Sequence, residues 1–450
     1  MNDIVADLHL HSKYSRAVSP QMVLSVMSIF ARQKGINLIT ASDFTHPLWF
    51  REIENELEEV SDGIYGLKTE RELDNRTSFL LSTEISCIYT QKVKGRRVHN
   101  LIFAPNLQTA EKINKEMMQR GFNLNSDGRP IIGLSSKNLL QLIMEIDERC
   151  FLIPCHVWTP WFGIYGQMSG FESLDEAFED LAPYVYGIET GLSSDPEMNW
   201  SIKELKTRSI LSFSDAHSPA KIGREATVFI RKNEDLKDNF TYDDIRFAVM
   251  QKNLNFKIGY TIEFYPEEGK YHFSGHRNCN ITMTPEEQKE SRGICPVCKK
   301  PVTDGVLRRV DQLSDSKVKA KKKENDQKLA WYLDPEKNHP PFVKIVPLIE
   351  IIAESQNVMV GSKKVKEVYD NLITALGSEF DILLKVEISK IAQVAGVKIA
   401  KGIEKVRQGN IVIKPGYDGV FGVVKIWDKE NENNNILEKT QDVSQLGINF

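Results

Sequence analysis

Two histidines separated by a single residue stand near the start of the chain. His9 and His11 follow a short run of apolar and β-branched residues that predicts a first strand. If that strand continues through His11, its two-residue period turns both imidazoles to the same side. Neutral imidazoles that converge in this way are suitable ligands for zinc, manganese or iron. For this motif alone, a polar strand edge without a metal is the alternative.

Other side chains that bind metals stand at or near the ends of further apolar runs. The runs that predict strands are residues 4–8, 36–40, 79–82, 98–104, 151–154, 185–188 and 210–213. The side chains near their ends are Asp7, Asp43, His46, Glu84, His99, His156, Glu189, Asp215 and His217. A single buried histidine is usually a core residue, but six of the nine histidines of the chain fall at these points. We therefore expect one shared polynuclear metal site.

Such a site would suit phosphoryl chemistry. Carboxylates can bridge two metal ions while imidazoles fill the terminal positions. One ion lowers the pKa of a bound water to make a nucleophile, and the remaining charge stabilises the developing oxyanions and the leaving group. The pattern thus predicts hydrolysis that needs no serine or cysteine nucleophile.

Helix-like segments separate several of the predicted strands. They are residues 21–34, 109–120, 135–148 and 173–181. This alternation predicts an α/β domain over residues 1–262, with parallel strands and outer helices, as a barrel or an open sheet. In both folds ligands collect at the carboxyl ends of the strands, where the metal-binding side chains are expected.

The composition is ordinary for a globular protein. Hydrophobic residues make up 41% and charged residues 27% of the 450, the net charge is −4, and the length suggests two or three domains. Neither an apolar run of about 18 residues nor a secretion signal is seen, so we expect a cytoplasmic protein without a membrane partner. Three scattered and three clustered cysteines favour reduced thiols and a metal over a disulfide framework.

A cysteine-rich segment begins near residue 263, where the composition changes. His276 and Cys279 have the His-x-x-Cys spacing, and Cys295 and Cys298 have the Cys-x-x-Cys spacing. These four side chains would complete the tetrahedron of a structural Zn ion, with His272 as an alternative to His276. We expect a small zinc-binding module over residues 263–312. Such modules often serve only to stabilise a small fold.

Basic residues and helices follow the cysteines. A basic linker or helix is expected over residues 313–341. It contains the five lysines from Lys317 to Lys323, and Arg308 and Arg309 come just before it. The lysines are either a solvated face or a contact to a phosphate backbone. Residues 342–428 predict a mainly helical domain with a β-hairpin, which could bind DNA. Residues 429–450 predict a flexible tail.

Aromatic side chains adjoin one of the predicted ligands. Trp158 and Trp161 closely follow His156. Packing in the core is one interpretation, and stacking on an unpaired or flipped base is the other.

Four motifs and two further histidines carry a resemblance to a known family. They are Asp7-Leu8-His9-Leu10-His11-Ser12, Ser42-Asp43, Thr83-Glu84-Ile85 and Ser214-Asp215-Ala216-His217, with His99 and His156. In these the chain resembles the PHP (polymerase and histidinol phosphatase) family of phosphoesterases, which implies a distorted (βα)7 barrel. It also implies a first metal held by His9, His11, Glu84 and Asp215, and a second held by Glu84 with His99 and His156.

The chain departs from the pattern of the PHP family at a third metal site. Arg16 and Phe44 stand where the family has an aspartate and a histidine. His46 and His217 could still hold a third ion. Arg16 could instead bind a phosphate in place of the missing metal.

Segments beyond the barrel extend the resemblance to nearly the whole chain. Gly-His-Arg-x-Cys with Cys-Pro-x-Cys, Gly-Val-Leu-x-Arg-Val and Pro-Gly-Tyr-Asp-Gly-Val-Phe-Gly occur in this order. The chain is similar in these to the endonuclease Q family, whose barrel also has His-Ser-x-Tyr-Ser-Arg and Asp-Phe-Thr-His-Pro-Leu-Trp. That family cleaves double-stranded DNA on the 5′ side of deaminated bases (uracil, hypoxanthine, xanthine) and of abasic sites.

This second resemblance implies specific roles. The barrel would hold two or three divalent ions (Zn, Mn or Mg), with Asp215, Glu84, His217 and Arg16 as catalytic residues. The lesion would be flipped out of the duplex while water attacks the adjacent phosphate. The residues expected to bind DNA are Arg16, Trp158, Trp161, Arg308, Arg309 and Lys317.

The end of the chain resembles a shortened sliding-clamp-binding peptide. Gln445, Ile448 and Phe450 would be its anchors, although the spacing departs by one residue from the usual form. A tail that ends in a stray aromatic residue is the alternative. For the whole chain, the alternative functions are a PHP-type phosphatase or exonuclease on smaller esters and a DNA-binding module with a degenerate barrel. The second would require lost ligands, and none is missing.

Overall fold

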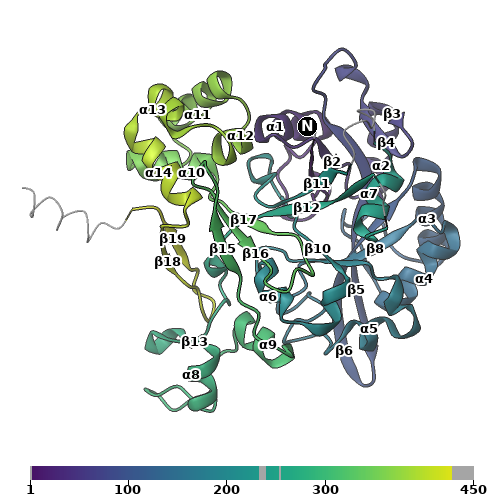
Figure 1. Ribbon diagram of the computed structural model, residues 1–450. Coiled ribbons are helices and arrows are strands. Elements are labelled where there is room, and N and C mark those ends of the chain that lie inside the picture. The colour runs from purple at the N-terminus through teal and green to yellow at the C-terminus, as the bar shows by residue number, and fades with distance from the viewer. Residues whose placement is uncertain (1–2, 233–239, 253–254, 428–450) are drawn as a thin grey trace, which may run out of the picture.

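A sheet of mixed strand pairing forms the centre of the molecule (Figure 1). The structure is a computed structural model that describes residues 3–232, 240–252 and 255–427. All seven predicted strands are present as β1 (Ile4–Asp7), β2 (Leu38–Thr40), β5 (Ser78–Gln91), β6 (Lys94–Ala104), β8 (Phe151–Pro154), β9 (Gly187–Glu189) and β10 (Ser209–Leu211). β1, β2 and β5 pair in parallel, as do β9 and β10. Backbone contacts link the other neighbours, from Val157 to Glu189 and from Leu10 to Ala216.

β6 departs from the parallel order that the sequence predicts. It pairs antiparallel with β5 and β8, because β5 and β6 form a hairpin with Lys92 and Val93 at its turn. Both turn residues have positive φ, as a two-residue hairpin turn of this kind requires. Lysine and valine give no signal for such a turn. The first half of β6 therefore lies beside the second half of β5, which brings His99 next to Glu84.

The sheet continues into the second half of the chain. β11 (Ala226–Arg231) pairs with β1, and β12 (Phe256–Glu263), β17 (Phe342–Lys344), β16 (Ala330–Leu333) and β15 (Lys321–Glu324) follow in that order. Residues 313–341, expected as a basic linker or helix, thus include two strands of the sheet. β15 is an exposed edge strand, and its lysines protect it from pairing with other chains. β3 (Leu57–Ser61), β4 (Ile64–Leu67) and β7 (Ile131–Ile132) complete this sheet.

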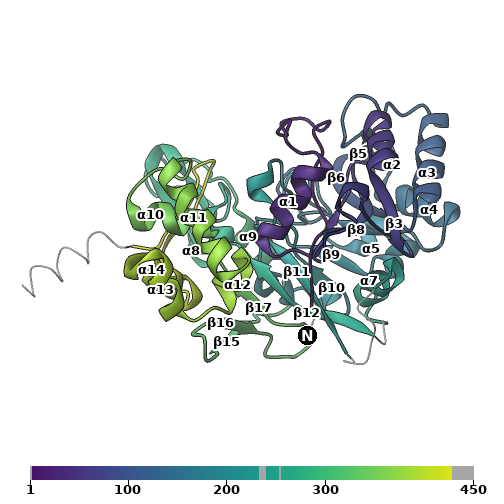
Figure 2. The ribbon, with the colours of Figure 1, turned by 90° about the horizontal axis from the view of Figure 1, so that it is seen from above.

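Helices cover the first half of the sheet and gather separately in the second half (Figure 2). The helices of the first half are α1 (Leu24–Lys34), α2 (Pro47–Glu56), α3 (Leu107–Gln119), α4 (Ser136–Ile146), α5 (Leu174–Phe178), α6 (Pro196–Trp200) and α7 (Tyr242–Val249). Those of the second half are α8 (Pro285–Glu290), α9 (Val306–Leu313), α10 (Leu348–Gln356), α11 (Lys363–Leu376), α12 (Glu379–Leu384), α13 (Ile388–Ala395) and α14 (Val397–Arg407). No helix of the described segments is long and apolar enough to cross a membrane.

A buried ion pair joins the C-terminal helices to the first half. Lys34, at the end of α1, lies 2.6 Å from Glu379 at the start of α12. Glu379 also accepts hydrogen bonds from the Leu348 N–H and the Tyr369 hydroxyl, so its charge is fully satisfied. Two short hairpins, β13 (Ser274–His276) with β14 (Ile281–Met283) and β18 (Val412–Lys414) with β19 (Val423–Lys425), lie in the second half.

Candidate metal centre

Glu84 lies at the centre of the site, and both oxygens of its carboxylate face histidines. Oε1 lies 2.6 Å from Nδ1 of His99 and 3.2 Å from Nε2 of His156. Oε2 lies 3.1 Å from Nε2 of His11 and 3.7 Å from Nε2 of His9. Two groups of potential ligands share this carboxylate, and within each group the ligand atoms lie within 4.8 Å of one another.

Asp215 and His217 add a third group that overlaps the first. Oδ1 of Asp215 lies 3.1 Å from Nε2 of His11 and 3.7 Å from Nε2 of His9. His217 donates its Nδ1 proton to the Asp215 carbonyl at 2.8 Å, which leaves its Nε2 free to accept or to bind a metal. The structure therefore brings together six of the predicted ligands around Glu84.

Two buried carboxylates orient the first pair of histidines. Glu189 lies 2.9 Å from Nδ1 of His9, and Asp43 lies 3.1 Å from Nδ1 of His11. Each imidazole can thereby keep its proton on Nδ1 and present Nε2 toward Glu84. Carboxylates in this position fix the ring orientation of metal-binding histidines and make them better ligands. Both carboxylates follow predicted strands, but the sequence does not distinguish an orienting role from a ligand role.

The donor atoms of the site fit a divalent cation. Nε2 of His9, Nε2 of His11 and Oδ1 of Asp215 are buried and make no hydrogen bond of good geometry to the described residues. Buried polar atoms rarely remain unpaired, and nitrogen and carboxylate oxygen together suit zinc or manganese. Burial alone would raise the pKa of Glu84, but His99 and Arg129 outweigh it and hold that pKa well below its usual range.

Sharp turns at the strand ends aim these side chains inward. Asp43, His156 and Asp215 have positive φ angles of 37°, 29° and 48°. Residues other than glycine seldom adopt this conformation, and it is concentrated at functional sites. Gly191 packs so tightly against His156 that a Cβ there would overlap the histidine side chain.

An open cavity of about 380 Å³ reaches two of the histidines and Asp215. Its walls include His99, His156 and Asp215, with Arg16 and Arg129. Arg16 is largely exposed, as a residue that meets a substrate phosphate would be. Arg129 was not predicted, because it stands in a loop that follows no strand.

Two other side chains near the motifs play structural parts. Asp7 accepts hydrogen bonds from the Ser214 N–H and hydroxyl and from the Gly223 N–H, and burial raises its pKa to about 6. His46 stacks on Tyr14 at 4.3 Å and belongs to none of the ligand groups formed by described residues. The structure thus offers no support for His46 as a ligand of a third ion.

Two residues expected to bind DNA are buried instead. Trp158 is 1% exposed, and its indole N–H donates to Asn199 at 2.8 Å, so it belongs to the core. Arg309 is 8% exposed and donates to the carbonyls of Tyr165 and Phe171, so its charge holds α9 against the loop that follows β8. Large aromatic and basic side chains suit either role, and only the fold decides between them.

The other residues expected to bind DNA remain accessible. Trp161 is 45% exposed, and the Arg97 guanidinium lies 5.8 Å from the centre of its ring. Lys317 is mostly exposed and pairs with Glu286. Arg308 is partly buried and pairs with Asp311 at 3.0 Å. Gln445, Ile448 and Phe450 lie outside the described residues.

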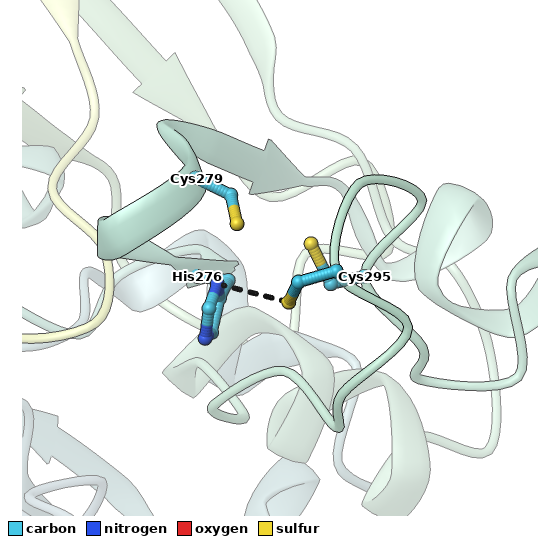
Figure 3. A group of neighbouring side chains, drawn as sticks. His276, Cys279 and Cys295 are labelled. Atoms are coloured by element: carbon cyan, nitrogen blue, oxygen red, sulfur yellow. Dashed lines mark hydrogen bonds between the residues drawn. The ribbon is translucent and has the colours of Figure 1, made fainter.

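A second candidate metal site stands apart in the second half of the chain. The side chains of His276, Cys279 and Cys295 point toward one another (Figure 3), and with Cys298 their ligand atoms lie within 4.8 Å of each other. Burial and the two neighbouring sulfurs raise the pKa of Cys279 to about 11, a penalty that a bound cation would relieve. Three sulfurs and one nitrogen fit a tetrahedral zinc. His272 is buried away from this group.

Comparison with known proteins finds relatives for parts of this chain. Residues 347–410 match the family described as MJ0043 C-terminal domain. The uncharacterized protein MJ0043 of Methanocaldococcus jannaschii is 29% identical over 270 residues, which cover 59% of this chain. The chain spans only 31% of the length of that relative.

Two solved structures match over almost the full length. The lesion-specific endonuclease PfuEndoQ of Pyrococcus furiosus has a TM-score of 0.78 and 28% identity, and the match covers 96% of this chain and 99% of that one. Endonuclease Q in complex with a 27-mer duplex that has an abasic lesion at the active site also has a TM-score of 0.78, with 29% identity over 95% of this chain and 98% of that one. The resemblance of this chain to endonuclease Q, which its motifs predict, is therefore confirmed over nearly its whole length.

Proposed function

We propose that this chain is a metal-dependent DNA repair endonuclease. It would cleave the phosphodiester bond 5′ of deaminated bases (uracil, hypoxanthine, xanthine) and of abasic sites. The observation that carries this proposal is the Glu84 carboxylate, whose two oxygens face separate histidine groups in a chain with the fold of endonuclease Q. We propose that the strands around it form the distorted PHP barrel that the motifs imply.

Each group of the site has a distinct task in this reaction. Zn, Mn or Mg ions, when bound, would supply an activated water and the charge that stabilises the negative charge developing on the phosphate in the transition state. His9, His11 and Asp215 would hold one ion and His99 with His156 the other, with Glu84 shared. Asp43 and Glu189 keep the first two imidazoles in the tautomer that leaves Nε2 free. His217 and Arg16 would meet the phosphate or the leaving oxygen.

The duplex would extend from the cavity over the second half of the chain. Trp161 offers an exposed ring, and stacking on a base would contribute about 1–3 kcal/mol. Lys317, Arg308, the zinc-binding module with a structural Zn ion, and the C-terminal helices would contact the phosphate backbone. We also propose that Gln445, Ile448 and Phe450 anchor the chain to a sliding clamp.

A cleavage assay tests this function. Labelled duplexes that carry one uracil, one hypoxanthine, one abasic site or no lesion are incubated with and without a divalent metal, using wild type, Asp215→Asn and the exposed control Glu116→Gln. We expect a metal-dependent nick immediately 5′ of each lesion that Asp215→Asn abolishes and Glu116→Gln retains. Hydrolysis of a simple phosphate ester without any lesion-directed nick would instead support a phosphatase.

A further inference from the structure

Asp127 holds two arginines on the same wall of the catalytic cavity. Its Oδ1 accepts the backbone N–H of Arg16 at 3.2 Å and that of Arg129 at 3.1 Å, although the two residues are far apart in the chain. Its Oδ2 lies 3.4 Å from Nε of Arg16. The Asp127 carboxylate is nearly buried, which favours its hydrogen bonds to the two backbone N–H groups, whereas the Arg16 guanidinium is largely exposed. One acidic residue therefore sets the positions of both cations.

The loop that carries Arg129 is held rigidly. The Gly128 N–H donates to the Tyr14 carbonyl, and the Pro130 carbonyl accepts the Ser86 N–H. A Cβ at Gly128 would overlap the carboxylate of Asp43, so only glycine allows this loop to approach the histidines so closely. Arg129 thus projects from a fixed backbone into the site.

The guanidinium of Arg129 meets the oxygen of Glu84 that also faces His11. Its Nη1 lies 3.1 Å from Oε2 of Glu84, and its side chain is 23% exposed to the cavity. A guanidinium has five N–H donors in a planar fork, and this contact uses one of them. The other donors lie in the wall of the cavity that also contains His99, His156 and Asp215.

We propose that Arg129 binds a non-bridging oxygen of the scissile phosphate, beside Arg16. This inference rests on the proposed function and adds a residue that touches the substrate. A planar fork can bind a phosphate and a carboxylate together, so Arg129 can remain near Glu84 while it contacts the DNA. Because its charge also opposes cations at Glu84, Arg129 weakens metal binding in the absence of DNA.

The test separates a phosphate contact from a counter-ion role. Dissociation constants are measured by fluorescence anisotropy, in chelator, for two duplexes with the same abasic-site analogue. One has an ordinary phosphodiester 5′ of the lesion, and the other has an uncharged methylphosphonate there. The proteins are wild type, Arg129→Gln, Arg129→Lys and the surface control Arg120→Gln, whose side chain is exposed and pairs with Glu116.

We expect Arg129→Gln to weaken binding to the phosphodiester duplex about tenfold and to leave binding to the methylphosphonate duplex nearly unchanged. Arg129→Lys should recover part of the loss, and Arg120→Gln should match wild type. An equal loss on both duplexes, or no loss on either, would overturn the proposal. An undamaged duplex of the same sequence is measured in parallel with wild type. If wild type does not prefer the phosphodiester lesion duplex to this undamaged duplex, the proposed function fails instead.

Metal binding gives a second readout that does not depend on activity. Titration of Mn²⁺ into chelator-treated protein should show several-fold tighter binding for Arg129→Gln than for wild type, because a positive charge beside Glu84 is removed. Unchanged or weaker metal binding would contradict the placement of this charge. Tighter binding without any effect on the phosphodiester duplex would reduce Arg129 to a counter-ion of Glu84.

Discussion

The two candidate metal sites of this molecule are built in opposite ways. The site around Glu84 draws its ligands from strand ends that span residues 9 to 217, and carboxylates behind the first two histidines orient them. The site at Cys295 draws all four ligands from residues 276 to 298, on two short turns. The first is deeply buried beneath an open cavity, whereas three of the four ligands of the second are partly exposed. A buried site with oriented ligands and an open cavity suits catalysis. A site whose four ligands come from one short segment and can surround the ion suits a structural metal.

Replacement of the shared carboxylate is expected to have the largest effect on the rate of cleavage. Glu84→Gln should lower the rate of nicking by about a thousandfold or more, because one change weakens both halves of the site. Rates are measured under single-turnover conditions with the uracil duplex. Metal analysis should still find zinc at the cysteines. Retention of most of the rate would show that Glu84 is not shared by two catalytic ions.

A smaller loss of activity or metal affinity is expected when a carboxylate that orients a histidine ligand is replaced. Glu189→Gln replaces an acceptor for Nδ1 of His9 by a group that can donate, so the favoured tautomer of His9 changes. We expect a loss of about 10- to 100-fold in activity or metal affinity, as is usual for such orienting groups. Glu179→Gln, at an exposed glutamate that pairs with Lys137, serves as the control. Equal behaviour of the two variants would remove Glu189 from the account.

The cysteine site should respond differently. Cys295→Ser should release one zinc ion and lower the thermal stability of the module, because structural zinc contributes folding free energy directly. DNA affinity should fall by about tenfold through lost backbone contacts, while the ions at Glu84 stay bound. Metal analysis and anisotropy measure the two effects. Loss of all bound metal would show that the two sites are not independent.

The smallest expected effect concerns a buried carboxyl outside both sites. Burial raises the pKa of Glu263 to about 8, from an ordinary value of 4.5, and the Ser212 hydroxyl donates to it at 2.5 Å. The folded chain therefore keeps a proton that the unfolded chain releases, so this group lowers stability as pH rises from about 4.5 to about 8. Glu263→Gln should raise the thermal midpoint by about 3 °C at pH 8.5 and change it little at pH 4.

Thermal unfolding followed by circular dichroism at both pH values measures this difference. The exposed control Glu336→Gln, at a residue that pairs with Lys206, should show no pH-dependent gain. The same shift at both pH values would contradict a raised pKa and would indicate a packing effect instead.

Local patterns predict the strands and the side chains that the structure gathers around Glu84 and Cys295. Each of these depends on period, spacing or short motifs that neighbouring residues determine. The antiparallel β6 was missed because Lys92 and Val93 form a turn without a typical turn residue. The sequence favours DNA contacts for Trp158 and Arg309, but both side chains are buried. Burial of a large side chain depends on the whole fold, so neighbouring residues do not reveal it. Arg129 was missed because a long-range contact to Asp127, rather than a motif, brings it into the site.

Anomalous diffraction from crystals soaked in Mn²⁺ tests the central claim most directly. We expect two strong manganese peaks at Glu84, one beside each carboxylate oxygen, with His9 and His11 at one peak and His99 and His156 at the other. We also expect a separate zinc peak among His276 and the three cysteines. A single peak on one side of Glu84, or none, would contradict a shared two-metal site.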